Sequence, residues 1–305
     1  MKNTKKKILL VLLCVFLLTG CTTQLKGSDG KTVKNPTTGQ TLTKNILCQP
    51  EDDETRSLYL NNGVNIEELP MCEKFSVTDG GYDGVWSSLI VKPLAWLIIF
   101  LGNIVKKYGF GLILASLLIR LVAFPLTKKT AIQSELINKA KPELDKLEKK
   151  YEGKTDQESM MKKSNEMAMI YKKYNINPIA GCLFAFLQIP LFIGFLEAIN
   201  RVPAIFEETF GGFQLGTTPL TGLTNGNYIY IVLTVVVAVS TYFSLKLNSS
   251  SNPDNQQMKM MSRVMFFMIL FTSIFMTSAL NIYWVTTNLF TVVQNILVKR
   301  QKEKV

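Results

Sequence analysis

Arg120 is the residue whose position in this sequence most directly indicates chemistry. It lies within GFGLILASLLIRLVAFPL, residues 109–126, a stretch apolar enough to enter a bilayer. A guanidinium at that depth costs about 2.5 to 3.5 kcal/mol on insertion scales, so it requires water, a partner or a path to the interface. Ser116 lies one helical turn earlier on the same face, so two polar groups point inward together. We interpret Arg120 as a functional group suited to attracting anions; the alternative is that its long side chain only snorkels to the membrane surface.

A second polar feature occupies residues 281–298. Along this block, five polar or amphipathic side chains recur at spacings of three and four: Asn281, Trp284, Asn288, Thr291 and Asn295. One face of the helix is therefore wettable. Lipid does not tolerate such a face unpaired, which directs it to a bundle interior or a water-filled groove. Hydrogen bonding between helices is the alternative use of these groups. Both polar features together predict a hydrated cavity inside the membrane.

Several kinds of chemistry are excluded by what the sequence lacks. It contains no histidine, which removes Ser/His and Cys/His catalysis, HExxH zinc sites and histidine proton relays. It also contains no GxxxxGK[ST], GxGxxG or CxxC motif. We therefore expect a protein that is not an enzyme and that uses no metal, nucleotide or other cofactor.

Composition indicates the class of protein. Of the 305 residues 47% are hydrophobic, and they occur in long blocks, which is typical of a multi-spanning membrane protein. The formal charge is +11. Basic cytoplasmic loops that face anionic lipid or ribosomal RNA would account for this charge.

The first 20 residues predict a leader that is removed. A basic start and an apolar run precede Leu18-Thr19-Gly20-Cys21, which resembles the lipobox of bacterial lipoproteins. This resemblance implies cleavage before Cys21 and acylation of Cys21, for example with palmitate. An uncleaved signal anchor is the alternative, and in both cases the chain after Cys21 starts outside the cytoplasm.

Residues 21–84 predict a loop-rich extracytoplasmic segment. They are rich in Thr, Asn, Gly and Asp and contain only short apolar runs. Cys48 and Cys72 lie on the oxidising side, where a disulfide between them could close the loop. Two free cysteines are the alternative.

Residues 85–107 are expected to form a helix along the outer membrane interface. Pro93 interrupts the run, and the longest apolar block after it, residues 94–101, is too short to cross about 30 Å of hydrocarbon. If this segment crossed as well as residues 108–126, every later loop would invert against the positive-inside rule. We therefore predict an interfacial helix.

Residues 127–177 predict a cytoplasmic helical hairpin. They hold twelve lysines and eight acidic residues, in two helical stretches, 128–150 and 156–174, separated by Gly153. Thr155 and Glu158 have the spacing of a capping box for the second helix. A merely solvated charged linker is the alternative.

The complete expectation is an all-α membrane protein with five transmembrane helices, the cytoplasmic hairpin and the outer interfacial helix. The spans are residues 108–126, 178–200, 228–247, 263–279 and 281–298. Loop 201–227 lacks lysine and contains Glu207 and Glu208, as expected outside, whereas loop 248–262 and the basic tail 299–305 are expected inside. This topology places the N-terminus outside a bacterial cell membrane, held by lipid, and the C-terminus in the cytoplasm.

Three stretches resemble signatures of the YidC/Oxa/Alb family of membrane protein insertases: GFGLILASLLIRLVAFPLTKK, NPIAGCLFAFLQIPLFIGF and NIYWVTTNLFTVVQNIL. The arginine, QIP and YWxxxN occur in the family's order and spacing, and the resemblance covers residues 85–299. With its lipobox, the chain is similar to the Gram-positive, lipoprotein-type YidC members. One departure is SALN at residues 278–281, where the family usually carries Pro-x-Gly; it bears on how the last span begins.

The resemblance implies a fold and a mechanism. The spans would enclose a hydrophilic groove open to the cytoplasm and to lipid, and closed toward the outside. Arg120 would attract the acidic N-terminal tail of a nascent membrane protein, and four side chains would line the groove: Ser116, Gln188, Trp284 and Asn288. For Gln188, a purely structural bond between helices is the alternative. The client would then move into lipid and fold without nucleotide hydrolysis, with the ribosome and the Sec translocon as partners.

Two other classes remain as alternatives. A small-solute transporter could use Arg120 as an anion site, although nothing resembles an inverted repeat and five spans do not divide evenly. A scaffold or assembly factor would use Arg120 only for packing. Replacement of Arg120 by lysine separates them, since an insertase that needs only positive charge tolerates lysine and a bidentate anion site does not.

Overall fold

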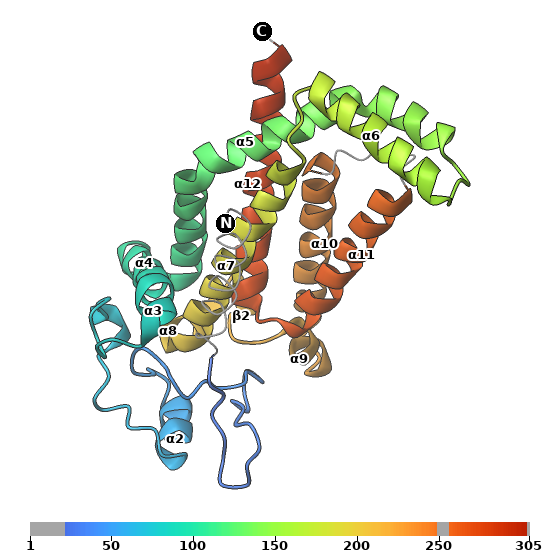
Figure 1. The fold of residues 1–305 in the computed structure, drawn as a ribbon. Helices are drawn as coiled ribbons and strands as arrows, with labels where there is room; N and C mark the ends of the chain where they lie inside the picture. Colours follow the sequence, from blue (N-terminus) through green and yellow to red (C-terminus); the bar gives the residue numbers. More distant parts are fainter. Residues whose placement is uncertain (1–21, 249–255, 304–305) are drawn as a thin grey trace. The chain divides into compact units, whose positions relative to one another are not determined.

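The computed structural model describes residues 22–248 and 256–303, and they are mostly helical (Figure 1). The predicted leader, Cys21 and part of the expected loop 248–262 lie outside these residues. The chain forms two compact units. The first comprises Met1–Leu118, Ile189–Thr234 and Ser273–Trp284; the second comprises Ile119–Gln188, Val235–Thr272 and Val285–Val305. Five long helices of the described residues each contribute residues to both units.

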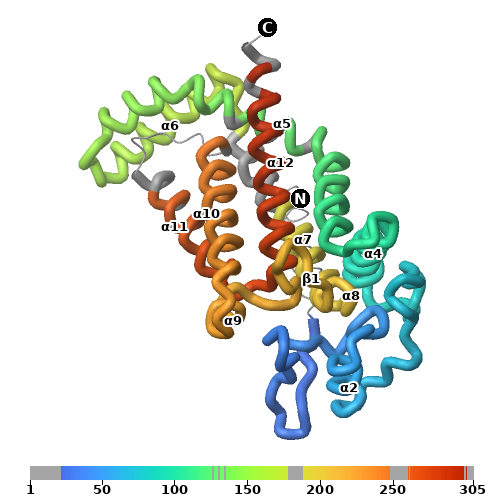
Figure 2. Tube along the Cα trace, turned by 180° about the vertical axis from the view of Figure 1, so that it is seen from behind, coloured from blue at the N-terminus to red at the C-terminus, as the bar shows by residue number. Residues whose placement is uncertain are grey.

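The N-terminal segment of the first unit folds around a small apolar core. Isolated β-bridges pair Gln24 with Thr43 and Lys34 with Thr41, and α2 (Asp53–Asn61) follows. The core is formed by Leu25, Leu42, Ile46, Tyr59, Ile66 and Phe206. The short helix η1 (Cys72–Lys74) ends this part of the segment, which Figure 2 shows from behind. Because Phe206 comes from a later part of the chain, the segment is packed onto the rest of its unit.

Residues 84–105 form one helical run made of α3 (Gly84–Trp86), the π-helix η2 (Ser87–Val91) and α4 (Lys92–Val105). The expectation that Pro93 leaves an apolar block too short to span a membrane was wrong. Pro93 lies in the first turn of α4, directly after the wide π-turn, where its missing N–H breaks no hydrogen bond of that helix. Lys106 then turns the chain with a φ of 55°.

Helix α5 (Tyr108–Lys150) joins the expected first span and the first helix of the expected hairpin without a break. The expected boundary near residue 126 is absent, and both Pro125 and Pro142 lie inside the helix. Asp156 is the N-cap of helix α6 (Gln157–Lys173), and its carboxylate accepts the Ser159 N–H at 2.8 Å. The predicted capping box was therefore wrong by one residue.

The end of α5 packs antiparallel to α6 within the second unit (Figure 1). Ala140, Leu144 and Ile176 form the apolar contact. Three ion pairs follow the same register: Glu148 with Lys163 at 3.2 Å, Glu166 with Lys150 at 2.6 Å, and Glu143 with Lys173. These pairs are exposed or half-exposed, so solvent screens them and they mainly set the register.

The remaining long helices are α7 (Pro178–Arg201), α10 (Ile229–Asn248), α11 (Gln256–Phe275) and α12 (Ser278–Glu303). Helices α10 and α11 lie side by side in both views (Figures 1 and 2). Between α7 and α10 lie α8 (Pro203–Phe206), the strands β1 (Thr209–Phe210) and β2 (Phe213–Gln214), and α9 (Pro219–Thr224). The two strands pair antiparallel.

The sequence departure at residues 278–281 builds a defined start for α12. Ser278 donates its backbone N–H and its hydroxyl to the Thr217 carbonyl at 2.9 and 2.8 Å. Asn281 donates its amide to the carbonyls of Ser273 and Thr277 at the end of α11, at 2.9 and 3.3 Å. Asn281, expected on the wettable face, is thus used to satisfy the end of a neighbouring helix.

Three helices in the described part of the chain are long and apolar enough to cross a membrane: Gly84–Val105, Tyr108–Pro125 and Ile229–Leu247. Ser262–Phe275 is apolar but shorter. Helix α12, which contains the expected fifth span 281–298, is absent from this group, because its polar stripe lowers its mean hydropathy. The first of the three, Gly84–Val105, is the segment that we predict along the membrane interface. Its length allows it to span the membrane but does not decide between the two positions.

Candidate functional site

Arg120 lies on α5 in the second unit, with only 6% of the residue exposed. Its Nη2 donates to Oε1 of Gln188 on α7 at 2.6 Å. An amide carries no charge, so this bond orients the guanidinium without cancelling its positive charge. The structure therefore brings together two predicted site residues that come from different family motifs. The arrangement places a buried guanidinium beside the amide of Gln188.

Asn288 of α12 is also held in the second unit. Its Nδ2 donates to Thr241 Oγ1 at 2.9 Å and approaches Ser240 Oγ at 3.4 Å, both on α10. Thr241 and Ser240 are buried, with 1% and 5% exposure. Sequence reasoning missed this hydroxyl pair, although the spacing of Ser240, Thr241 and Ser244 inside an apolar block could have indicated a polar face on α10.

A third polar contact of the second unit joins α5 to α12. Thr127 Oγ1 lies 3.2 Å from Gln294 Oε1 and donates to it, and both residues are buried. Phe124 and Phe290 meet edge to face beside it, with ring centroids 6.5 Å apart. In a bilayer, buried polar groups of this kind must be satisfied by other protein groups or by water. The second unit therefore has a polar interior shared by α5, α7, α10 and α12.

Ser116 and Trp284, the other two predicted groove residues, lie in the first unit. Ser116 is 1% exposed and donates its hydroxyl to the Leu112 carbonyl of its own helix at 2.6 Å. Trp284 packs edge to face on Phe192, with ring centroids 5.1 Å apart. These contacts give both residues a packing role within the unit.

A buried charge network in the first unit was also missed by sequence reasoning. Arg201, at the end of α7, donates to Asp83 Oδ2 at 2.7 Å and to Ser87 Oγ at 2.8 Å. Glu197, one turn earlier, accepts the indole N–H of Trp86 at 3.0 Å. Burial raises the pKa of Asp83, but the bonds from Arg201 and Ser87 outweigh it and hold that pKa below its ordinary value. Glu197 and Arg201, at the end of the apolar block 178–200, were the sequence signal that could have indicated this network.

A disulfide joins Cys48 and Cys72 in the N-terminal segment, with Cα atoms 4.8 Å apart. Gln49 and Met71, the residues inside the two cysteines, form a parallel bridge. The disulfide and this bridge hold residues 48–51 next to residues 71–74. Both of these short segments carry charged side chains, so the disulfide and the bridge also hold those charges near one another.

Apolar helices with a buried polar interior define a helical membrane protein of the multi-pass class. Comparison with known proteins identifies its family: residues 100–304 match the family model of the 60Kd inner membrane protein. The chain therefore belongs to this family, the YidC family of insertases. The match begins at residue 100, so the disulfide-containing segment lies outside it.

Similar proteins come from several bacteria. The chain is 36% identical to the membrane protein insertase MisCA of Bacillus subtilis (strain 168) over 216 residues, which are 70% of this chain and 79% of the relative. It is 34% identical to membrane protein insertase YidC 2 of Listeria innocua over 72% of this chain and 76% of the relative. A crystal structure of an active YidC insertase has the same fold, with a TM-score of 0.52 and 19% identity over 79% of this chain and 50% of that one.

Proposed function

We propose that this protein inserts nascent membrane proteins into the cell membrane and helps them fold. The observation that carries the proposal is the buried guanidinium of Arg120 on an apolar helix, where it donates to Gln188 at 2.6 Å. The relatives are named membrane protein insertases, which supports the same function. No nucleotide is required in this proposal.

The acidic N-terminal tail of a client would be drawn to Arg120. A carboxylate that reaches the guanidinium gains a charge-assisted hydrogen bond, which is stronger than the bond from the neutral Gln188. The apolar segment of the client then enters lipid, stabilised by about 25 cal/mol per Å² of apolar surface removed from water and helped by the membrane potential. Arg120 would thus lower the barrier to tail movement, and lipid would supply the driving force.

The polar interior of the second unit would form part of a hydrated groove. Asn288, held by Thr241, and Gln294, bonded to Thr127, would present polar atoms to water and to the client tail. The family resemblance also assigns Ser116 and Trp284 to the groove, and within their own unit both have the packing contacts described above. Water in the groove shortens the apolar path that a charged tail must cross.

We also propose that residues 85–107 lie along the outer interface. The segment before them contacts the helix at two distant points: Lys92 Nζ donates to the carbonyls of Asp79 and Gly81 at 2.6 Å, and Asn103 Nδ2 donates to the Glu73 carbonyl at 3.0 Å. Eleven residues of helix are about 16 Å long. If this helix crossed the membrane, an irregular polar segment would have to follow it into hydrocarbon, where unpaired backbone is not tolerated.

Contacts among the segments expected outside support the five-span topology. Arg201 bonds Asp83 and accepts the Leu47 N–H at its carbonyl, and Glu208 accepts the Tyr108 N–H at 2.5 Å. Loop 201–227, the N-terminal segment and the start of α5 are therefore joined in one unit, as a common location outside the cytoplasm requires. The paired end of α5 and α6 would then lie in the cytoplasm and receive clients.

The ends of the chain complete the proposal. Cleavage and acylation at Cys21 would anchor the N-terminal segment to the outer leaflet. The basic C-terminal tail would contact the ribosome or the Sec translocon. These partners follow from the charge of the tail and from the family resemblance.

The test measures insertion of a single-span client with an acidic N-terminal tail into liposomes that contain only this purified protein. Wild type is expected to insert the client without nucleotide, whereas Arg120→Ala is expected to fail while its helical content stays unchanged. Arg263→Ala is the matched control, because Arg263 is an exposed arginine on another apolar helix. Equal insertion by wild type and Arg120→Ala would remove the role of Arg120.

Arg120→Lys separates the insertase from an anion transporter. Lysine keeps the positive charge but lacks the planar fork that binds an anion through two parallel bonds. An insertase that needs charge keeps most of its activity with lysine. Anion uptake by wild-type liposomes that disappears in Arg120→Lys, without client insertion by either protein, would instead assign the transporter class.

A further inference from the structure

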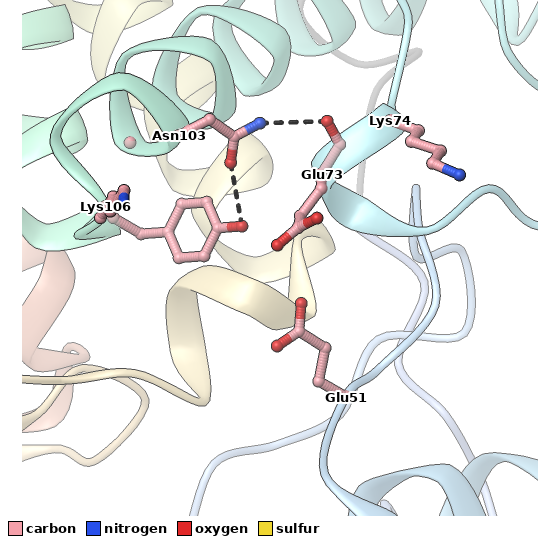
Figure 3. A pocket seen from close by; sticks show the side chains of 7 residues that line it. Glu51, Glu73, Lys74, Asn103 and Lys106 are labelled. Carbon is pink, nitrogen blue, oxygen red and sulfur yellow. Dashed lines mark hydrogen bonds between the residues drawn. The ribbon is translucent and has the colours of Figure 1, made fainter.

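A pocket of about 530 Å³ opens beside the turn between α4 and α5 in the first unit (Figure 3). Its walls come from three parts of the chain, and its lining residues are Glu51, Glu73, Lys74, Gly102, Asn103, Lys106 and Tyr108. The volume is much larger than a single ion needs and suits a small organic group. Four of the seven residues carry a full charge.

The charges of this pocket are separated from each other. Figure 3 shows the carboxylates of Glu51 and Glu73 facing one another, while the ammonium of Lys74 points away from both. No ion pair joins either carboxylate to Lys74 or Lys106. A pocket that keeps two negative and two positive groups apart is complementary to a ligand whose own opposite charges are apart.

The backbone that carries Glu51 and Glu73 is held in place by the surrounding structure. Asn103 donates to the Glu73 carbonyl at 3.0 Å and accepts the Tyr108 hydroxyl at 3.2 Å, as the dashed lines in Figure 3 show. Glu73 directly follows the bridged Cys72. The Glu51 N–H donates to Glu207 at 3.0 Å. The backbone that carries the pocket is therefore pre-organised, which lowers the entropy lost on binding.

Apolar side chains next to the pocket point to an amphipathic ligand. Ile104 is 63% exposed and directly follows the lining residue Asn103, and Phe110 is 50% exposed and lies two residues after Tyr108. Phe110 belongs to the helix Tyr108–Pro125, one of those able to cross a membrane. A ligand with a charged end in the pocket would have its apolar part beside these two residues.

We propose that this pocket binds a zwitterionic group that carries an ammonium and a phosphate, as in the headgroup of an ethanolamine phospholipid of the outer leaflet. The ammonium lies between Glu51 and Glu73, and the phosphate lies toward Lys106, which Figure 3 shows on the opposite side of the carboxylates from Lys74. The lipid source rests on the topology proposed above, which places this turn at the outer surface. The site adds a lipid contact to the segment that the family model does not cover.

The test measures binding of water-soluble, short-chain phosphatidylethanolamine to the purified full-length protein in detergent. Short-chain phosphatidylglycerol has the phosphate but no ammonium, and glycerophosphoethanolamine has the headgroup but no acyl chains. Wild type is expected to bind the ethanolamine lipid about tenfold more tightly than the glycerol lipid, the effect of one charge-assisted bond. It is also expected to bind it more tightly than the chain-free headgroup.

Two variants assign the charges. Glu51→Gln/Glu73→Gln is expected to lose the preference for ethanolamine, and Lys106→Asn is expected to weaken both lipids. Neither carboxylate accepts a hydrogen bond in the fold, and Asn tolerates the positive φ of Lys106. Glu67→Gln/Lys44→Gln, with exposed residues of the same segment, is the matched control.

Each outcome decides the proposal. Ethanolamine binding that survives in the carboxylate variant within about twofold, or equal binding of the two lipids by wild type, overturns it. If the chain-free headgroup binds as tightly as the lipid and both variants lose it, the zwitterion site stands with a soluble ligand. Client insertion is measured in parallel, so loss of insertion with intact lipid binding removes the proposed function and leaves the pocket.

Discussion

Glu207 makes the attachment of the N-terminal segment sensitive to pH. It directly follows α8, and its Oε2 accepts the backbone N–H groups of Glu51 and Asp52, just before α2, at 3.0 and 3.3 Å. Its Oε1 is buried and has no hydrogen-bond donor within residues 22–248 and 256–303. The fully buried Tyr59 lies close enough for the charge of Glu207 to act on its hydroxyl. The Glu207 carboxyl therefore joins loop 201–227 to the N-terminal segment, and its burial disfavours the ionised form.

The size of the effect follows from the pKa of this group. Burial raises the pKa of Glu207 from 4.5 to about 7, and the nearby carboxylates of Asp52 and Glu51 act in the same direction, while the two N–H donors oppose them. Because the pKa is higher in the folded state, the stability from the neutral carboxyl is complete below pH 4.5 and is lost as the pH rises through 7. A tenfold change in acidity corresponds to about 1.4 kcal/mol, so the total loss is about 3 kcal/mol.

Hydrogen–deuterium exchange of α2 at pH 5.5 and pH 8.5, corrected for intrinsic exchange rates, measures this loss. We expect wild type to lose protection of α2 at the higher pH by roughly thirtyfold if α2 opens with the segment, since pH 5.5 already lies above the ordinary pKa of 4.5. Glu207→Gln keeps an acceptor oxygen but cannot ionise, so its protection should not depend on pH. Glu67→Gln is the control and should behave as wild type. Equal protection of wild type at both pH values, or pH dependence that persists in Glu207→Gln, would refute the reasoning.

Three further predictions concern the disulfide and the polar interior. The pair Cys48→Ala/Cys72→Ala opens a link between residues 24 apart and should lower the free energy of unfolding of the N-terminal segment by about 3 kcal/mol, measured by denaturant titration; an unchanged midpoint contradicts this. A double-mutant cycle of Thr241→Val and Asn288→Leu should give a coupling of about 0.6 kcal/mol in unfolding from mild detergent, and zero coupling would exclude a structural contribution from that bond. Gln188→Glu puts a carboxylate against Arg120 and should reduce insertion of an acidic client nearly as much as Arg120→Ala, whereas Gln188→Leu should reduce it less; the reverse order would contradict the account.

The sequence predicts the helices and the main site residues because each leaves a local signal. Arg120 is recognisable as a charge in an apolar block, and Gln188 through the motif that contains it. Their bond could not be predicted from spacing, since 68 residues separate them and helical periodicity does not set the register of two distant helices. The contact of Asn288 with Thr241 was missed for the same reason.

Predictions from the local sequence were wrong where tertiary contacts outweigh the local preference of a residue. Pro93 reads as a helix breaker, but the π-turn before it lets the helix continue. Asp156 rather than Thr155 is the N-cap of α6. Either side chain can cap a helix, so packing against α5 decides where this helix starts. Asn281 fits the polar stripe by spacing, yet its amide serves the end of α11. Glu207 and Glu208 read as an outside loop, and their bonds to two other segments have no sequence signal.

The central claim is that Arg120 acts on clients by attracting their negative charge. Its most direct test is a charge exchange in the liposome insertion assay, with Arg120→Glu paired with clients whose N-terminal tails are acidic or basic. The account predicts that Arg120→Glu fails with the acidic tail and regains insertion with the basic tail, while wild type shows the opposite preference. If Arg120→Glu inserts the acidic tail as well as wild type does, or if the basic tail restores nothing, charge attraction by Arg120 is not the mechanism.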